Sequence, residues 1–471
     1  MNTSQVINDS GIEFGTSGAR GLVVDFNIIN TAAFTLAFLN HIKNKYKFES
    51  VGIAIDNRPS SYGIAQFCAA AVEYLGLTPV FYGVVPTPAL ANQCMADNIP
   101  AIMVTGSHIP FDRNGLKFYT PEGEIDKCDE LSILNAGFDF EFSSMTLPSL
   151  NVCHSAAQQY ISRYTTLLSD DFLSGMHIGI YEHSSAGREI YPVLFRALGA
   201  TVTSFGRSDE FVPIDTEAVS SEDCSKALVW SQHYKLDAIF STDGDGDRPL
   251  IADENGVWLR GDILGLLSAV ELDIKALSVP VSCNTIIETV GFFDQVCRTR
   301  IGSPHVIQAF SGLKQKFDKV AGFEANGGFL LGSDVAYGDG ILTALPTRDA
   351  VLPAIMLFSA AKQSSISTLV KALPARYTCS DRIQNFAKNK SAALLESIKS
   401  DPSAFILSSG LDGAVKTINE TDGLRMSLSN DNIIHLRPSG NAPELRCYVE
   451  AHSSEEAHKV VDIIINYLKD L

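Results

Sequence analysis

The chain has 471 residues, and at roughly 150 residues per domain this length predicts three or four domains rather than one hydrophobic core. Apolar residues make up 45% of it and charged residues 19%, which excludes an intrinsically disordered protein. The formal net charge of −18 argues against binding to nucleic acid or to an anionic membrane surface, because both need basic patches.

The cysteines and the N-terminus predict a soluble cytoplasmic protein. The nine cysteines are scattered without a C-x-x-C pair, and an odd number of this kind is typical of reduced thiols. The first residues, "MNTSQVINDSGIEFG", lack the basic start and apolar stretch of a signal peptide. The longest apolar stretch, "AVLPAIMLFSAA" (350–361), is well short of the roughly 18 to 20 residues that span a bilayer.

Strand-like apolar runs alternate with helical patterns through most of the chain. Val51 to Ile55 predict a buried strand, and small apolar residues at helical spacing predict a helix from about Ser61. Similar units follow at 176–200 and 276–296. This alternation predicts mainly parallel sheets covered by helices. Units at intervals of about 100 residues are typical of three α/β domains of related topology.

The end of the chain, from about Ser364, predicts a smaller α+β domain of about 100 residues. Leu445 to Ala451 predict a strand, and Ser453 with Glu456 forms a capping-box pattern that opens a helix. The apolar residues of that helix are Val460, Val461, Ile464 and Tyr467. We expect the four domains to span residues 1–150, 151–252, 253–370 and 371–471.

Ser107 lies in a predicted loop between two strands, in "VTGSHIPFDRNGLKFY" (104–119). Val104 leads into the loop, and apolar residues lead out of it around Lys117, which is close enough in sequence to fold back toward the serine. Such a loop is either an ordinary surface turn or a support that presents Ser107 as a reactive hydroxyl. This stretch alone leaves both interpretations open.

Asp243, Asp245 and Asp247 alternate with glycines after the apolar run 238–240, in "LDAIFSTDGDGDRPLI". In an extended chain alternate side chains point to one side, so three carboxylates can converge on one cation. The glycines allow the backbone to bend tightly. Hard oxygen ligands that leave a position for a phosphate oxygen suit Mg²⁺.

Other interpretations of the aspartates are weaker. An EF-hand also begins D-x-D-x-D, and Glu254 falls at its twelfth position, but Arg248 stands where the sixth residue should be glycine. A solvated turn would leave three neighbouring acids repelling one another without a cation. A D-x-D motif after a strand also occurs in haloacid-dehalogenase-like phosphatases, which use an aspartate as nucleophile. If this chain were such an enzyme, its other motifs would have no role.

A third cluster, "HLRPSGNAPELRCYVEA", has the composition of an anion-binding loop. Arg437 and Arg446 flank a turn whose Ser439, Gly440 and Asn441 can offer successive backbone N–H groups. Concave backbone N–H groups bind anions, and arginine adds planar, charge-assisted hydrogen bonds to phosphate. A purely structural turn is the alternative for this stretch considered alone.

A fourth cluster, "AGFEANGGFLLG", places Glu324 and Asn326 in a loop bracketed by glycines. A carboxylate can accept hydrogen bonds from two neighbouring sugar hydroxyls. Without the other motifs, an exposed glutamate in an ordinary turn would be the better interpretation. The sequence therefore offers a serine, an acidic loop, an anion-binding loop and a candidate sugar-binding loop.

The joint occurrence and order of these motifs resembles the α-D-phosphohexomutase family, which includes the phosphomannomutases and phosphoglucomutases. The resemblance covers essentially the whole chain. It is carried by "FGTSGARG" (14–21), "GVVPTPAL" (83–90), "TGSHIP" (105–110), "DGDGDR" (243–248), the Glu324 loop and "RPSGNAPELR" (437–446).

The resemblance implies three topologically similar α/β domains and a smaller C-terminal α+β domain around one central cleft. It implies an isomerase that interconverts hexose 6-phosphate and hexose 1-phosphate through a phosphoserine, with hexose 1,6-bisphosphate as intermediate and primer. Mannose is the favoured sugar; a phosphoglucomutase and a non-catalytic phosphosugar-binding relative are the alternatives. The expected partner is a small sugar phosphate, and the expected state is a monomer or homodimer.

The resemblance also implies a role for each site residue. The catalytic residues are Ser107, which carries the phosphoryl group, Arg20, His108 and Arg248, which line the transfer site, and Lys117, which assists proton movement. The ligands of Mg²⁺ are Ser107 through its phosphate, Asp243, Asp245 and Asp247. The sugar hydroxyls are bound by Glu324 and Asn326. The phosphate that is not transferred is bound by Arg437, Ser439, Gly440, Asn441 and Arg446.

Several positions depart from the family pattern. The serine motif usually reads S-H-N-P, and Ile109 replaces the asparagine here. The sugar loop commonly reads G-E-x-S-G-H, but Asn326 stands at the serine and Gly328 at the histidine. The last motif usually reads R-P-S-G-T-E-P, whereas Asn441 and Ala442 occupy the Thr-Glu positions. The missing histidine removes a candidate proton-transfer group, and these changes bear on which sugar is bound.

Overall fold

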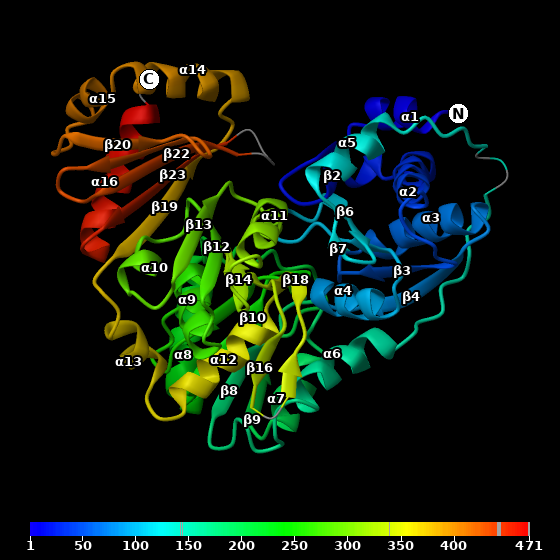
Figure 1. The fold of residues 1–471 in the computed structure, drawn as a ribbon, viewed down its shortest axis with the longest axis horizontal. Helices are drawn as coiled ribbons and strands as arrows, with labels where there is room; N and C mark the ends of the chain where they lie inside the picture. Colours follow the sequence, from blue (N-terminus) through cyan, green and yellow to red (C-terminus); the bar gives the residue numbers. More distant parts are fainter. Residues whose placement is uncertain (142, 144, 339, 440–443, 470–471) are drawn as a thin grey trace.

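The computed structural model describes residues 1–469 except 142, 144, 339 and 440–443. In this described part, the strands form four sheets and a small hairpin, with helices packed around them (Figure 1). We number the sheets 1 to 4 in chain order. No helix among the described residues is both long and apolar enough to cross a bilayer.

Sheet 1 belongs to the first part of the chain and has the strand order β1-β2-β6-β5-β3-β4, with β7 beside β6. The continuous apolar run of β3 is buried almost throughout, as is typical of a strand covered on both faces. The strands are β1 (Glu13–Phe14), β2 (Ala19–Leu22), β3 (Ser50–Ile55), β4 (Thr78–Val84), β5 (Ala101–Val104), β6 (Arg113–Thr120) and β7 (Gly123–Glu124). The helices are α1 (Thr3–Asp9), η1 (Val23–Asp25), α2 (Ile28–Ile42), α3 (Ser61–Tyr74), α4 (Thr87–Ala96) and α5 (Lys127–Asn135).

Sheet 2 has the order β11-β10-β8-β9, and sheet 3 has the order β13-β12-β14-β15-β18. Sheet 2 and its helices comprise α6 (Ser155–Thr165), β8 (His177–Tyr181), α7 (Tyr191–Ala197), β9 (Thr201–Phe205), α8 (Ser221–Tyr234), β10 (Ala238–Thr242) and β11 (Pro249–Ala252). The strands of sheet 3 and the hairpin are β12 (Ala276–Pro280), β13 (Gln295–Thr299), β14 (Val320–Phe323), β15 (Phe329–Leu331), β16 (Val335–Tyr337), β17 (Gly340–Leu342) and β18 (Leu345–Asp349). Their helices are α9 (Gly261–Glu271), α10 (Ile286–Thr289), α11 (Ser303–Leu313), α12 (Val351–Ala361) and α13 (Ile366–Lys371).

Sheets 1, 2 and 3 share one topology, which confirms the expected similarity of three α/β units. In each, the first parallel strand is central and the next two parallel strands lie on either side of it, as β4-β3-β5, β9-β8-β10 and β13-β12-β14. The third strand then pairs antiparallel with the strand that follows it, as β5 with β6, β10 with β11 and β14 with β15. Helices connect the parallel strands, because a parallel return needs a long crossover.

The sheets are mixed rather than mainly parallel, which corrects the sequence expectation. In sheet 1, β1, β2, β6 and β7 are paired antiparallel. The connections 105–112, 243–248 and 324–328 are too short for a crossover helix, so the chain returns antiparallel. They occupy the same place in the three sheets and contain Ser107, the aspartates and Glu324 respectively.

Sheet 4 is antiparallel throughout, with the order β19-β23-β22-β21-β20, and confirms the smaller α+β unit. Glu456 N donates to Ser453 Oγ at 3.1 Å immediately before α16, whose buried residues follow helical spacing. The elements are β19 (Tyr377–Ile383), α14 (Lys388–Ser400), α15 (Pro402–Ser408), β20 (Val415–Asn419), β21 (Leu424–Leu428), β22 (Ile433–Pro438), β23 (Leu445–Ala451) and α16 (Ser454–Lys469). The domain boundaries near 150, 253 and 370 stay predictions.

One apolar cluster is shared between units, and each unit also packs a cluster of its own. The shared cluster is continuous through sheets 1, 2 and 3 and includes Ala54, Ile178 and Leu277 from their central strands. Sheet 4 packs its own cluster, drawn from residues 383–468, against α16. Figure 1 shows this last unit, in orange and red, beside the others. The first three units therefore have a shared cluster in addition to their own, whereas the shared cluster contains no described residue of sheet 4.

Candidate active site

Ser107 lies in the 105–112 loop, fully buried and with a left-handed backbone φ of 52°. This conformation costs a non-glycine residue about 1–2 kcal/mol. The serine Oγ donates a 2.5 Å hydrogen bond to Asp243 Oδ2, and its backbone N donates to Thr105 Oγ1 at 2.7 Å. The strained serine thus contacts the aspartate loop of sheet 2 directly, which a surface turn would not do.

Arg58, which the sequence analysis did not single out, holds this loop. Its guanidinium donates hydrogen bonds to backbone carbonyls of the loop and of β6, those of Ser107 (2.9 Å), Ile109 (2.5 Å), Pro110 (2.7 Å) and Arg113 (3.0 Å). Its Nε lies 3.2 Å from Asp56 Oδ2, and the Phe211 ring lies 4.0 Å from its Cζ. A usable signal was present: Asp56 and Arg58 directly follow the carboxyl end of parallel strand β3, where sites in α/β sheets gather.

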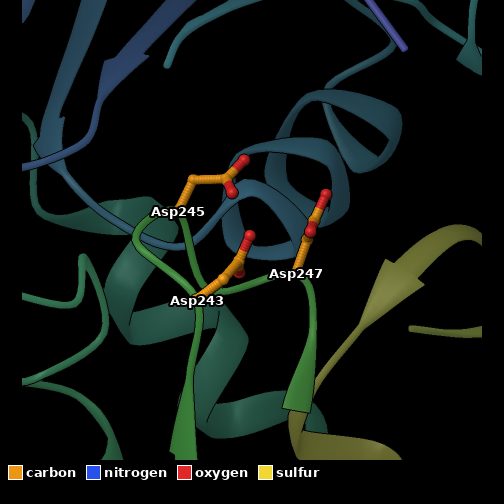
Figure 2. A group of neighbouring side chains, drawn as sticks. All are labelled: Asp243, Asp245 and Asp247. Atoms are coloured by element: carbon orange, nitrogen blue, oxygen red, sulfur yellow. The ribbon is translucent and has the colours of Figure 1, made fainter. Parts of the chain in front are cut away.

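The three aspartates form a buried cluster of carboxylates. Figure 2 shows their side chains projecting from the loop between β10 and β11, and one oxygen of each lies within 4.8 Å of the others. All are at most 1% exposed. Asp245 Oδ1 and Asp247 Oδ1 are buried without a hydrogen-bond partner among the described residues. Unsatisfied hard oxygen atoms in this arrangement fit a divalent cation.

Buried cations surround the carboxylates. Lys117 Nζ lies 2.6 Å from Asp245 Oδ2 and 2.5 Å from Asp247 Oδ2, and Arg248 Nε lies 3.8 Å from Asp243 Oδ2. Burial, with Asp245 and Asp247 as like charges, raises the pKa of Asp243 well above its usual value. Burial also opposes ionisation of Asp245, but the Lys117 ammonium outweighs it and lowers the pKa of that carboxyl. The neighbouring cations therefore stabilise part of this concentrated negative charge.

Residues of the 83–90 motif bind the aspartate loop and hold it in place. Thr87 N donates to the backbone oxygen of Asp245 at 2.9 Å, and Thr87 Oγ1 donates to Asp245 Oδ2 at 2.7 Å. Pro86 packs against Gly246, which has a φ of 71° that glycine adopts without steric cost. The motif therefore fixes both the backbone and one carboxylate of the loop.

Arg20 and His108 lie on the Ser107 side of the cluster. Arg20 Nη1 donates to Thr105 O at 3.1 Å, and burial lowers the pKa of Arg20 to about 10. Arg248 Nη1 donates to His108 Nδ1 at 2.9 Å, and that nitrogen lies 3.4 Å from Ser107 Oγ. Burial and the nearby arginines hold the pKa of His108 well below its usual value. His108 is therefore neutral at pH 7, with its proton on Nε2.

Glu324 and Asn326 lie in the corresponding loop of sheet 3. Asn326 Oδ1 accepts from Gly328 N at 2.9 Å, so this side chain also shapes its own loop. Glu324 Oε2 accepts from Arg348 Nη1 at 2.8 Å. Arg348, in β18, also places its Nε 3.1 Å from Asp247 Oδ2. Arg348 is not among the residues predicted from the sequence, and nothing in "ALPTRDA" (344–350) signals contacts with residues so distant in the chain.

The two arginines of the C-terminal motif are cross-strand partners in β22 and β23. Arg437 Nε lies 3.0 Å from Asp422 Oδ1. Arg446 is among the arginines whose charge lowers the pKa of His108, so it acts across to the Ser107 side of the site. Ser439 N donates to Glu444 O at 2.8 Å. The predicted residues Gly440 and Asn441 lie outside the described residues.

Models of one protein family match three parts of this chain, which do not include residues 140–260. Residues 11–139 match "Phosphoglucomutase/phosphomannomutase, alpha/beta/alpha domain I". Residues 261–377 match alpha/beta/alpha domain III of that family, and residues 384–466 match its C-terminal domain. These ranges contain the serine loop, the Glu324 loop and the C-terminal motif.

Individual relatives are similar over their full lengths. A phosphomannomutase of Salmonella muenchen is 57% identical over 469 residues, covering 99% of this chain and 98% of that one. A phosphomannomutase of Sinorhizobium fredii is 40% identical over 96% of this chain and 97% of its own. The structure of a putative phosphomannomutase from Thermus thermophilus has the same fold, with a TM-score of 0.77 at 19% identity, covering 98% of this chain and 99% of that chain.

Proposed function

Because the chain belongs to the phosphoglucomutase/phosphomannomutase family, we propose that it is a phosphohexomutase, an isomerase that interconverts hexose 6-phosphate and hexose 1-phosphate. The observation that carries the proposal is the 2.5 Å contact of Ser107 Oγ with Asp243 inside a buried cluster of carboxylates. The 57% identity to a phosphomannomutase supports mannose as the preferred sugar. The proposed partner is a small sugar phosphate, and the proposed location is the cytoplasm.

In the proposed reaction Ser107 carries the phosphoryl group. The bond between phosphorus and the serine oxygen breaks while a bond forms from phosphorus to the oxygen of the free sugar hydroxyl. The hydroxyl loses its proton and the departing serine oxygen gains one, a transfer that Lys117 assists. The resulting hexose 1,6-bisphosphate turns end over end and returns its other phosphate to Ser107. Such transfers depend mainly on positioning and charge neutralisation. Here Arg20 and Arg248 supply positive charge, and the neutral His108 helps to position the phosphoryl group.

The proposed cofactor is Mg²⁺, with Asp243, Asp245 and Asp247 as its protein ligands. Two buried carboxylate oxygens without partners among the described residues support a cation at this position. When bound, Mg²⁺ would polarise the phosphoryl group on Ser107. The remaining contacts divide between the sugar and its other phosphate: Glu324 and Asn326 bind hydroxyls, and Arg437, Ser439, Gly440, Asn441 and Arg446 bind the phosphate that is not transferred.

We expect mannose 1-phosphate to have the highest kcat/KM among mannose, glucose and glucosamine 1-phosphates. The measurement is a comparison of the three esters with Mg²⁺ and a catalytic amount of hexose 1,6-bisphosphate, and omission of the bisphosphate should slow the initial rate. A preference of more than about tenfold for the glucosamine ester would contradict the assignment of the sugar. Binding of all three without turnover would indicate a non-catalytic phosphosugar-binding protein instead.

A further inference from the structure

Arg348 lies where three predicted site segments meet. Its side chain is only 3% exposed. Its donors reach one residue in each of four segments that are distant in sequence: Asp247 (3.1 Å), Glu324 (2.8 Å), Ser303 at the start of α11 (3.0 Å) and Ser17 of the 14–21 motif (3.2 Å). One guanidinium therefore joins the aspartate loop to the loop of sheet 3 and to sheet 1.

The glycine at 328 leaves room for this arginine. A Cβ atom added to Gly328 would lie 2.4 Å from Cδ, 2.6 Å from Cγ and 2.9 Å from Cβ of Arg348. The clash involves the base of the side chain, so a change of rotamer at the guanidinium end does not relieve it. The backbone φ of Gly328 is not in the left-handed region, so the backbone conformation does not require glycine at this position. The space taken by Arg348 is what excludes a larger residue there.

We propose that Arg348 takes the place of the histidine that the family pattern has at position 328, and that it is a positioning residue that sets Glu324 relative to the aspartate loop. The inference rests on the proposed function. Glu324 is 3% exposed, and a buried carboxylate needs a charged or hydrogen-bonding partner. By binding one of its oxygens, Arg348 orients the other toward a sugar hydroxyl. The sugar-binding loop and the metal-binding loop then keep a constant separation.

An arginine suits this role and a lysine does not. The guanidinium offers five N–H donors in a rigid plane, and four acceptors on different segments use that geometry. A lysine ammonium keeps the charge but cannot reach the same set of acceptors. Arg348→Lys therefore separates positioning from charge compensation.

The first experiment measures sugar selectivity in Arg348→Lys. We expect KM for mannose 1-phosphate to rise at least about tenfold and the ratio of kcat/KM between mannose and glucose 1-phosphates to move toward one. Arg298→Lys is the matched control, because Arg298 in β13 also bonds a carboxylate, that of Glu288, and three backbone carbonyls, and none of these partners is a predicted site residue. We expect that control to keep the wild-type ratio.

A second readout does not depend on turnover. In Arg348→Ala, the loss of a positive charge beside Asp247 leaves the carboxylates more negative, so the Kd for Mn²⁺ measured by calorimetry should stay equal or fall. Binding of mannose 1-phosphate should weaken by about tenfold or more in the same protein. Weakened Mn²⁺ binding together with unchanged sugar binding would overturn the inference.

A double-mutant cycle tests whether the side chain of Arg348 occupies the space that the histidine of the family pattern would take at position 328. Gly328→Ala should lower Tm and activity in the wild-type background. It should cost less in Arg348→Ala, because that variant removes the Cγ and Cδ atoms that would lie 2.6 and 2.4 Å from the added Cβ and leaves only the contact with Cβ at 2.9 Å. Gly328→His with Arg348→Ala should recover part of the sugar selectivity that Arg348→Ala loses. If the effects of the substitutions at 328 and 348 on Tm and activity simply add, the proposed replacement of the histidine by Arg348 is contradicted.

The possible failures are distinguishable. Wild-type protein without turnover on any of the three esters overturns the proposed function and this inference with it. Wild-type turnover combined with an unchanged sugar ratio in Arg348→Lys overturns the inference alone.

Discussion

Ser107→Ala should abolish mutase turnover, with kcat reduced by more than about a thousandfold, while sugar phosphate still binds. The substitution removes the oxygen that carries the phosphoryl group but keeps the three carboxylates and the arginines of β22 and β23. Alanine also loses the hydrogen bond to Asp243. Calorimetry with mannose 1-phosphate measures binding, and intact-protein mass spectrometry after incubation with hexose bisphosphate should find one phosphate on the wild type and none on the variant.

Asp245→Asn should lose activity for a different reason from Ser107→Ala, because it weakens the cation site and keeps the serine. Its amide keeps the size of the side chain and an oxygen that can accept from Thr87, but it withdraws one negative charge from the cluster. The loss of activity should therefore be partly recovered at high Mg²⁺, whereas no Mg²⁺ concentration should recover Ser107→Ala. Equal responses of the two variants to Mg²⁺ would contradict this division of roles.

The location of the phosphate discriminates the nucleophiles. We expect it on the peptide that contains "TGSHIP", resistant to hydroxylamine. A hydroxylamine-labile phosphate would be an acyl phosphate on an aspartate, in agreement with the alternative that the D-x-D pattern left open. Near-normal turnover of Ser107→Ala would remove the proposed mechanism altogether.

Arg58→Ala should reduce kcat by about a hundredfold or more, although the hydrogen bonds of Arg58 to the serine loop all go to backbone carbonyls. Without these hydrogen bonds, the left-handed backbone at Ser107 has lost its main support. Asp56 would also become a buried charge without its ion pair, which typically costs about 3–5 kcal/mol of stability. Chemical denaturation and steady-state kinetics measure the two effects.

A double variant separates stability from positioning. Asp56→Asn combined with Arg58→Ala removes the uncompensated charge, and an asparagine oxygen can still accept from Thr105 Oγ1. We expect the double variant to regain much of the lost free energy of unfolding but little of the lost kcat. Recovery of both in parallel would mean that Arg58 acts only through stability.

Local patterns predicted the parts of the site that lie within single segments. Alternating aspartates and glycines predicted a cluster of carboxylates, and the apolar run before them predicted the strand that carries it. The antiparallel returns were not predicted, because the apolar run of β6 has the same appearance in a parallel or an antiparallel sheet.

Arg58 and Arg348 escaped prediction for a related reason. The Ser17 partner of Arg348 is 331 positions away in the chain, and the Ser107 partner of Arg58 is 49 positions away. Neither arginine belongs to a repeating pattern, since each acts through the meeting of segments that only the folded chain brings together. Their role becomes visible once the three short connections are known to occupy the same place in sheets 1, 2 and 3.

The separate core of sheet 4 has a consequence for inactivation by heat. A small unit buries a smaller fraction of its apolar surface than a large one, so this core should melt before the continuous core of sheets 1 to 3. Arg437 and Arg446 are carried by β22 and β23 of that unit. Activity should therefore disappear at a temperature at which most of the chain is still folded. Cooling from that temperature should restore it, because the folded remainder provides the surface on which the last unit docks again.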